Sequence, residues 1–331
     1  MIKERLKSLL NIPYYGAVGL HDPQREVEVW LRGAGEPIDV TYNNVVAALR
    51  PFTLGVMFDA NDLRTFDGQQ PRLCFHERAG RKRLLGVIHL RPMRAIPLSA
   101  HRFCLFETGA CENYSVSSLN LRLYYFNTQR QAAQKLRKDP YNFQMTQPDL
   151  RSSFVFYTCP RPVVLVSVEH EGASNIFPMD LIGPTDSPWF SMALRSTSPA
   201  VRLMQQSRRM ALASAPFSYK AIAYDLGKHH RQTSIDWTAL PFKTVPSPSF
   251  GLRVPEAALR IREVHVHEFH EVGSHTLFIT SIERDTRPEA APLQLFHFFG
   301  STANHLKTKT LPPVASFFKN PTPPAPRSPP Q

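Results

Sequence analysis

The second half of the chain consists mainly of short β-type runs, and this pattern limits its fold more than any other feature. The first run, at residues 162–168, is rich in β-branched residues and typical of a buried strand. Six further runs follow, at residues 175–182, 189–194, 210–213, 259–269, 276–283 and 294–298. Only two short helices are expected between them, at residues 198–206 and 217–226. Many strands with few short helices indicate an antiparallel barrel.

The first half of the chain has a more mixed pattern. Strands are predicted at residues 72–76, 84–90 and 103–106. Apolar and polar residues alternate from Leu119 to Tyr125, which predicts a fourth, half-buried strand. Thr128 and Gln131 have the spacing of a capping box and predict a helix after this strand. Residues 44–49 are expected to form a helical turn.

Composition divides the chain into three parts. We expect an α+β domain of unknown role at residues 1–150, with a basic amphipathic helix at 1–10 and a candidate linker at 141–149. A barrel domain is expected at residues 151–306. Residues 307–331 contain eight prolines, cannot form a packed core, and are expected to be a disordered tail. The expected fold class is therefore α+β, mainly β, with the barrel preceded by a smaller domain.

Charge and cysteine content narrow the class of protein. The formal net charge is +12, which favours anionic partners. The basic residues at 78–83 have no interleaved aromatic residues, so they indicate a solvated turn, and we expect no nucleic-acid partner. The four cysteines show no Cys-x-x-Cys spacing and are typical of reduced thiols. No apolar segment is long enough to cross a bilayer, so we expect a cytoplasmic protein without a membrane partner.

A polar loop connects the run at 189–194 to the predicted helix at 198–206. Ser198 is expected to be the N-cap of this helix, and Pro199 its first residue. Unpaired backbone N–H groups of the first turn, the helix dipole, and the side chains of Arg195, Ser196, Thr197 and Ser198 together suit a phosphate. A simple helix start accounts for the Ser-Pro pair as well, because N-caps are commoner than anion sites.

Four segments from about residue 152 to about 306 resemble the flavin reductase-like family, whose members fold as FMN-binding split barrels and usually work as homodimers. Pro162 to Val168 resembles the opening strand of that family, and Ser174 to Asp180 its second strand, which contacts the isoalloxazine ring. Arg195 to Pro199 resembles its phosphate loop, and Val272 to Ile279 its Gly-x-His-x-Leu-Phe turn and strand.

This resemblance implies a flavoprotein that binds FMN rather than FAD and uses NAD(P)H as co-substrate. It implies no catalytic side chain, because the flavin itself performs the redox step. The implied cofactor-binding residues are Asn175, Ile176, Pro178, Met179, Asp180, Arg195, Ser196, Thr197 and Ser198. His229 and His230 lie in an unusually basic segment, which either covers a phosphate or forms a solvated loop.

Two features depart from the family pattern. The strand at 210–214 ends in Ser214 where family members often have Asn, and residues 1–150 have no counterpart in the simplest reductases. Three functions therefore remain open. The first is an FMN-dependent oxidoreductase that passes hydride from NAD(P)H to a flavin and on to an unidentified acceptor. The second is a non-catalytic FMN-binding or electron-transfer partner, and the third is a basic nucleic-acid-associated protein.

Four histidines lie close together near the end of the barrel segment, at His265, His267, His270 and His275, with glutamates between them. A metal site is one interpretation, since His265 and His267 would share one face of a strand. The segment does not have the His-Glu-x-x-His pattern, so we favour a solvated sheet face and expect no metal. His275 is assigned to the turn of the family pattern.

Overall fold

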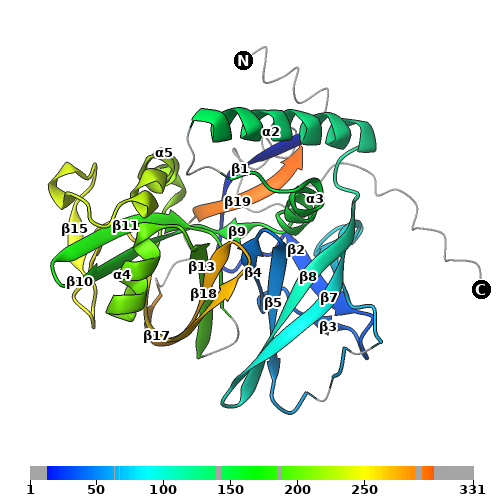
Figure 1. Ribbon diagram of the computed structural model, residues 1–331, viewed down its shortest axis with the longest axis horizontal. Helices are drawn as coiled ribbons and strands as arrows, with labels where there is room; N and C mark the ends of the chain where they lie inside the picture. Colours follow the sequence, from blue (N-terminus) through cyan, green and yellow to red (C-terminus); the bar gives the residue numbers. More distant parts are fainter. Residues whose placement is uncertain are drawn as a thin grey trace, which may run out of the picture.

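The computed structural model describes residues 13–62, 64–66, 68–138, 143–184, 188–287 and 293–301. These residues form two seven-stranded antiparallel sheets, a three-stranded sheet and a two-stranded ribbon (Figure 1). The first large sheet uses strands from before residue 114, and the second uses strands between residues 164 and 286. The predicted fold class, mainly β, is therefore confirmed. The expectations for residues 1–10 and 307–331 lie outside the described residues.

The first sheet has the strand order β3-β2-β6-β7-β8-β5-β4. Its strands are β2 (Val27–Arg32), β3 (Ile38–Asp39), β4 (Asn44–Leu49), β5 (Phe52–Asp59), β6 (Arg72–Glu77), β7 (Leu84–Leu98) and β8 (His101–Asn113). The predicted strands at 72–76, 84–90 and 103–106 are confirmed as parts of β6, β7 and β8. The expected helical turn at 44–49 is wrong, because this segment is β4. Five of its six residues are buried, since β4 contacts β12, β13 and β18 of the second sheet.

The second sheet has the order β11-β10-β14-β17-β18-β13-β12. Its strands are β10 (Val164–His170), β11 (Ala173–Met179), β12 (Ile182–Pro184), β13 (Trp189–Arg195), β14 (Arg209–Ser214), β17 (Arg260–Val272) and β18 (His275–Thr286). Helix α4 (Pro199–Ser207) connects β13 to β14 and contacts β10. The single strand predicted at 175–182 is two strands, because the chain leaves the ladder after Met179 and re-enters at Ile182.

Between β14 and β17 the chain forms short helices and a small ribbon. These elements are η1 (Phe217–Tyr219), α5 (Lys220–Asp225), η2 (Leu226–Arg231), η3 (Trp237–Ala239), β15 (Thr244–Pro246) and β16 (Arg253–Pro255). The helix predicted at residues 217–226 is η1 and α5, and the helical backbone continues through η2 to Arg231. Buried Glu263 of β17 holds the β15–β16 connection, because its carboxylate accepts hydrogen bonds from the backbone N–H groups of Ser249 and Phe250.

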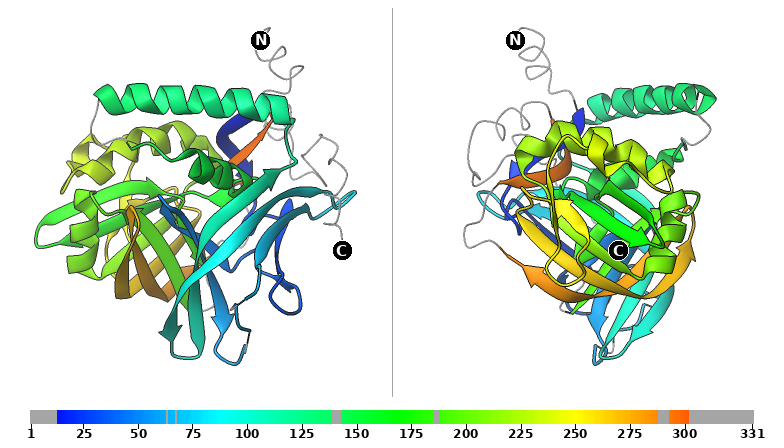
Figure 2. Two further views of the ribbon diagram at one scale, coloured as in Figure 1. Left: turned by 45° about the vertical axis from the view of Figure 1, so that its right-hand side comes forward. Right: turned by 90° about the vertical axis from the view of Figure 1, so that its left-hand side faces the viewer.

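The three-stranded sheet joins segments from both ends of the described chain. Strand β1 (Pro13–Leu20) pairs with β19 (Gln294–Ser301), and β19 pairs with β9 (Arg161–Pro162). Helix α2 (Ser118–Lys138) lies across this sheet, and α3 (Gln147–Phe156) lies between α2 and the first sheet (Figures 1 and 2). The ring of Phe154 on α3 stacks on Phe299 of β19 at 4.4 Å and on Tyr125 of α2 at 5.5 Å. The division of the chain near residue 150 stays a prediction.

Helix α2 corrects two expectations about residues 119–131. The predicted strand from Leu119 to Tyr125 forms the first turns of the helix, and Thr128 lies inside the helix instead of capping it. A strand would bury every second residue, but Leu119 and Leu123 are exposed. The buried residues are Leu121 and Tyr125, which are four positions apart and therefore lie on one face of the helix. The candidate linker at 141–149 is also wrong in its last residues, because Thr146 is the N-cap of helix α3 and residues 147–149 belong to that helix.

Gly86 of β7 lies where helix α3 packs on the first sheet. A methyl group added there would lie 2.7 Å from Val155 Cγ1 and 2.8 Å from the Glu112 carbonyl oxygen. The Glu112 backbone is held by the β7–β8 ladder, so we expect Gly86→Ala to lower the free energy of unfolding by about 1–3 kcal/mol. Urea unfolding measures this, with Gly227→Ala as the control because nothing lies within 4 Å of its added carbon. Equal midpoints for the two variants would contradict the expected clash.

Candidate functional site

The loop that follows β13 is fixed by the turn between β17 and β18. Arg195, the last residue of β13, pairs with His275, and the Ser196 N–H donates to the Ser274 carbonyl at 3.1 Å. Gly273 of the same turn has φ +52°, and a Cβ there would lie 2.4 Å from the Arg50 carbonyl oxygen. Only glycine therefore allows the turn to approach the first sheet so closely. The turn comprises residues 273–274, and His275 is already the first residue of β18.

The predicted helix start is confirmed, because Ser198 is the N-cap of α4 and Pro199 is its first residue. The Ser198 hydroxyl does not cap the helix, however, since it donates to the backbone carbonyl of His230 in η2. This bond brings residues 226–231 against the loop. His229 is also held, because its Nδ1 lies 2.9 Å from the Ile176 carbonyl oxygen of β11. The basic segment is therefore attached to both α4 and β11, and it is not a free solvated loop.

Arg195 sets the electrostatics of this loop. Its guanidinium carbon lies 4.4 Å from the centre of the Phe143 ring, in cation–π geometry. Burial and, to a smaller extent, the Arg195 charge together lower the pKa of His275 to about 4, against a smaller opposing effect of Asp180. Burial and the Arg195 charge also lower the pKa of His230. Near neutral pH both imidazoles are therefore neutral, and Arg195 supplies a permanent positive charge.

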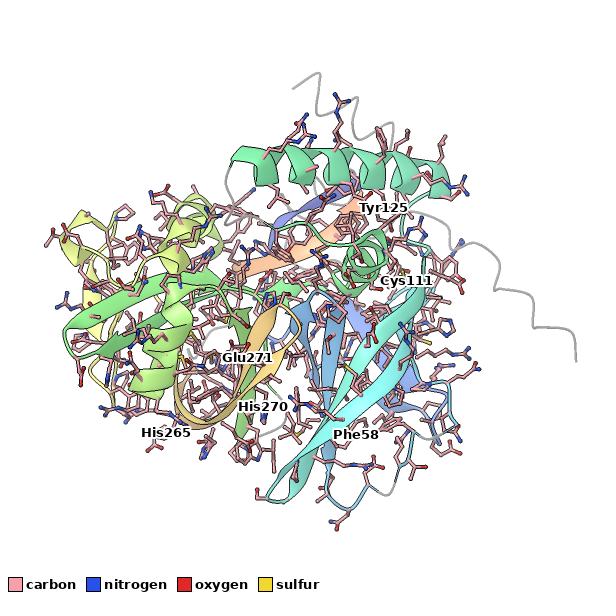
Figure 3. All side chains as sticks on the ribbon, in the orientation of Figure 1. Phe58, Cys111, Tyr125, His265, His270 and Glu271 are labelled. Carbon is pink, nitrogen blue, oxygen red and sulfur yellow. The ribbon has the colours of Figure 1, made fainter. Side chains whose placement is uncertain are left out.

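Ser196 and Thr197 differ in their availability to a ligand. The Ser196 hydroxyl donates to Glu271 Oε2 at 2.5 Å, and the Thr276 hydroxyl lies 2.8 Å from Glu271 Oε1. Thr197 is exposed. A phosphate at this loop would have to compete with the Glu271 carboxylate for Ser196. Figure 3 shows Glu271 near the middle of the molecule; it is the second-last residue of β17, whereas His265 lies halfway along the strand.

Asn175 and Ile176 of β11 form the side of the candidate site that faces η2. The Asn175 side chain is fully buried, and its Nδ2 donates to the carbonyls of His229 at 3.0 Å and Gln232 at 2.8 Å. Asn175 Oδ1 is also buried, and no partner for it exists among the described residues. An unused acceptor therefore remains on β11. Pro178 is half-buried, whereas Met179 belongs to the apolar core between α4 and the second sheet.

Asp180 is the centre of a hydrogen-bond network that the sequence did not indicate. Its Oδ2 accepts from the Tyr157 hydroxyl at 2.9 Å and the Tyr15 hydroxyl at 3.2 Å, and it lies 2.8 Å from His297 Nδ1. Burial acts to raise the pKa of Asp180, but these bonds and the His297 charge hold it below its usual value. Burial raises the pKa values of Tyr15 and Tyr157, which remain protonated donors. The Asp180 charge also acts on His275, which pairs with Arg195, so this network adjoins residues 195–198, called the Arg195 loop below.

The three histidines of β17 contact different neighbours and do not gather around one point. The rings of His265 and His267 lie 5.6 Å apart, His267 Nε2 lies 2.7 Å from the Ser281 hydroxyl, and His270 Nε2 lies 2.9 Å from Glu268 Oε2. Within the described part of the chain, no group of three His, Cys, Asp or Glu residues is arranged to hold a metal ion. The absence of a metal stays a prediction. Among the described helices, none has the length and apolar character needed to span a membrane.

Residues 156–304 match the sequence model of the flavin reductase like domain. The match covers just under half of the chain, and the resemblance stated from the sequence is confirmed for this segment. No curated protein matches the chain.

Solved structures similar to this chain include three flavin proteins. The FMN-binding protein of Thermus thermophilus with bound p-hydroxybenzaldehyde is 23% identical, with 43% of this chain and 86% of that chain covered and a TM-score of 0.37. The NADH:FAD oxidoreductase SgcE6 of Streptomyces globisporus is 17% identical, with coverages of 44% and 87% and a TM-score of 0.40. The styrene monooxygenase flavin reductase of Pseudomonas putida is 20% identical, with coverages of 45% and 95% and a TM-score of 0.37.

Proposed function

We propose that this protein binds FMN and passes hydride from NAD(P)H to the flavin and on to an acceptor. The observation that carries the proposal is Arg195, a permanent cation held between the β17–β18 turn and the first residues of α4, within the flavin reductase like domain. A guanidinium beside a helix N-terminus is a suitable place for a phosphate monoester. FAD is the alternative flavin.

The residues around Arg195 fit such a cofactor. Arg195 and Thr197 would hold the phosphate, while Ser196 and Ser198 fix the loop through Glu271 and His230. The unused Asn175 Oδ1 offers an acceptor for a flavin N–H, Ile176 and Pro178 belong to the same edge strand, and Asp180 directly follows it. Met179 supports this edge from the core. When bound, the flavin supplies the redox chemistry, and the chain only binds and orients it.

The attachment of η2 favours one of the two interpretations of His229 and His230. Because this segment is tied to Ser198 and to Ile176, we infer that it covers the phosphate of the flavin or of the nicotinamide ribose. The His230 imidazole, on which the Arg195 charge acts, adds a hydrogen-bonding group near Arg195. We further propose a cytoplasmic homodimer, without nucleic-acid or membrane partners, with the flavin domain at residues 151–306.

The test is a visible spectrum of the purified full-length protein, followed by titration with FMN and by assays of NADH and NADPH oxidation under air. We expect flavin absorbance, micromolar or tighter FMN binding, and flavin-dependent oxidation of a nicotinamide. Flavin binding without oxidation would replace the reductase by a non-catalytic FMN-binding or electron-transfer partner. A colourless protein that does not bind added FMN at micromolar concentration would reject the proposal.

A further inference from the structure

A cavity of about 210 Å³ lies where the three sheets meet, away from the Arg195 loop. Tyr42 and Asn44 line it from the first sheet and the loop that precedes β4, and Arg161 of β9 lines it from the three-stranded sheet. Ile182, Phe190 and Arg262 line it from the second sheet. Pockets for drug-sized ligands have roughly 300–1,000 Å³, so this one suits a smaller molecule.

Arg161 is a buried cation without a counter-ion. Its side chain is 6% exposed, its two terminal nitrogens donate to Asn44, and its guanidinium carbon lies 4.0 Å from the centre of the Phe156 ring. Among the described residues, no carboxylate pairs with it, and its Nε has no hydrogen-bond partner. Burial lowers the pKa of the Arg161 guanidinium, and the nearby Cys159 thiol and Tyr157 hydroxyl act in the opposite direction.

The other two largely buried arginines of the cavity, Arg260 and Arg262, are matched by two carboxylates, which makes Arg161 the exception among the buried cations described here. Arg262 lies 3.3 Å from Asp22 and 3.9 Å from Asp285, and Arg260 bonds the same two carboxylates at 2.7 and 2.5 Å. Arg287 also pairs with Asp285, but 71% of its side chain is exposed. A buried charge without a partner is costly, so the uncompensated position at Arg161 indicates an anion that is bound there in solution.

The walls of the cavity restrict what this anion is. Phe190, Phe296 and Ile182 are all at least 98% buried and line it, so most of its surface is apolar. A guanidinium edge binds a carboxylate through two parallel hydrogen bonds. Among the described buried groups of the cavity one positive charge, that of Arg161, is uncompensated, and a single negative charge balances it; Arg287 is exposed to solvent. We propose that the cavity binds a small hydrophobic monocarboxylate, with its acid group on Arg161 and its apolar body against Phe190 and Phe296.

This site is separate from the proposed flavin site. Phe296 and His297 are neighbours on β19, and their side chains point to opposite faces of the strand. Phe296 lines the cavity, whereas His297 contacts Asp180 on the other face. The carboxylate site does not depend on flavin binding, so either proposal can fail without the other.

The experiment is calorimetric titration of the full-length protein with benzoate, benzamide and phenyl phosphate. We expect saturable binding of benzoate with one site per chain. Benzamide, which has the same shape but no charge, should bind at least about tenfold more weakly. Arg161→Gln should weaken benzoate binding by at least about tenfold and abolish the preference over benzamide. Arg253→Gln, an exposed arginine outside the cavity, is the control and should bind benzoate like the wild type.

A surface variant keeps the test decisive if Arg161→Gln does not fold. Arg287→Glu changes the exposed residue at the mouth of the cavity and should weaken benzoate binding more strongly at low salt than at high salt. The proposal is overturned if benzoate does not bind at millimolar concentration. It is also overturned if benzoate and benzamide bind equally, or if phenyl phosphate binds more tightly than benzoate.

Discussion

Replacing Arg195 by alanine is expected to lower the affinity for FMN by at least about tenfold and to leave the fold intact. A charge-assisted bond between arginine and phosphate contributes about 1.5–3 kcal/mol, and each 1.4 kcal/mol is tenfold in affinity. The backbone of Arg195 stays in β13 through its pairing with His275, so removal of the half-buried side chain does not break the ladder. Fluorescence titration of the apoprotein with FMN measures the change.

The matched control for this experiment is Arg202→Ala. Arg202 is an exposed cation on α4, so its loss changes the net charge by the same amount without removing a group from the loop. An unchanged FMN affinity for Arg195→Ala would remove Arg195 from the site. An equal loss in both variants would show that only the overall charge matters. Adding Ser196→Ala should weaken binding a little more, because it also releases Glu271.

Arg195→Ala has a second readout that does not require a flavin. Because the Arg195 charge lowers the pKa of His230 and of His275, its removal should raise both pKa values. Nuclear magnetic resonance of the imidazole protons during a pH titration reports this shift. Unmoved pKa values would mean that Arg195 does not face these histidines in solution.

The strands of the segment that matches the flavin reductase like domain were predictable, because the sequence of each strand has a β pattern of its own. Strand β10 begins with four apolar residues among its first five, three of them valines, and those five residues are buried. The start of α4 was also predictable, since a serine before a proline specifies an N-cap and a first helical residue without any tertiary contact. The hydrogen bond from the Ser198 hydroxyl to the His230 carbonyl was not predictable, because the two residues meet only in the folded chain.

The remaining elements depend on contacts between distant segments. Strand β4 has the sequence NVVAAL, which contains helix formers, and it becomes a strand because it packs between β5 and the second sheet. The Asp180 network is the clearest case in the site. Tyr15 precedes Asp180 by 165 residues and His297 follows it by 117, so no spacing in the sequence predicts their meeting.

His275 should make the stability of the protein strongly dependent on pH. It is 2% exposed, and burial together with the Arg195 charge lowers its pKa from 6.5 to about 4. Between these two values the unfolded chain binds a proton that the folded chain does not bind, so stability falls as the pH falls. Each pH unit in this range costs about 1.4 kcal/mol, so we expect a loss of about 3 kcal/mol between pH 6.5 and 4.

Urea unfolding of the wild type and of His275→Gln at pH 7, 6, 5 and 4 isolates this effect. Glutamine cannot be protonated, so the variant should be less stable at pH 7 but should lose about 3 kcal/mol less on acidification. Carboxylates such as Asp180 and Glu263, whose pKa values are lowered in the fold, contribute equally to both proteins and cancel in the difference. His265→Gln, on an exposed position of β17, controls for the loss of a surface histidine. Parallel pH profiles for the wild type and His275→Gln would mean that His275 is accessible to protons in the folded protein, and the Arg195 loop would then be more open than its contacts with β18 imply.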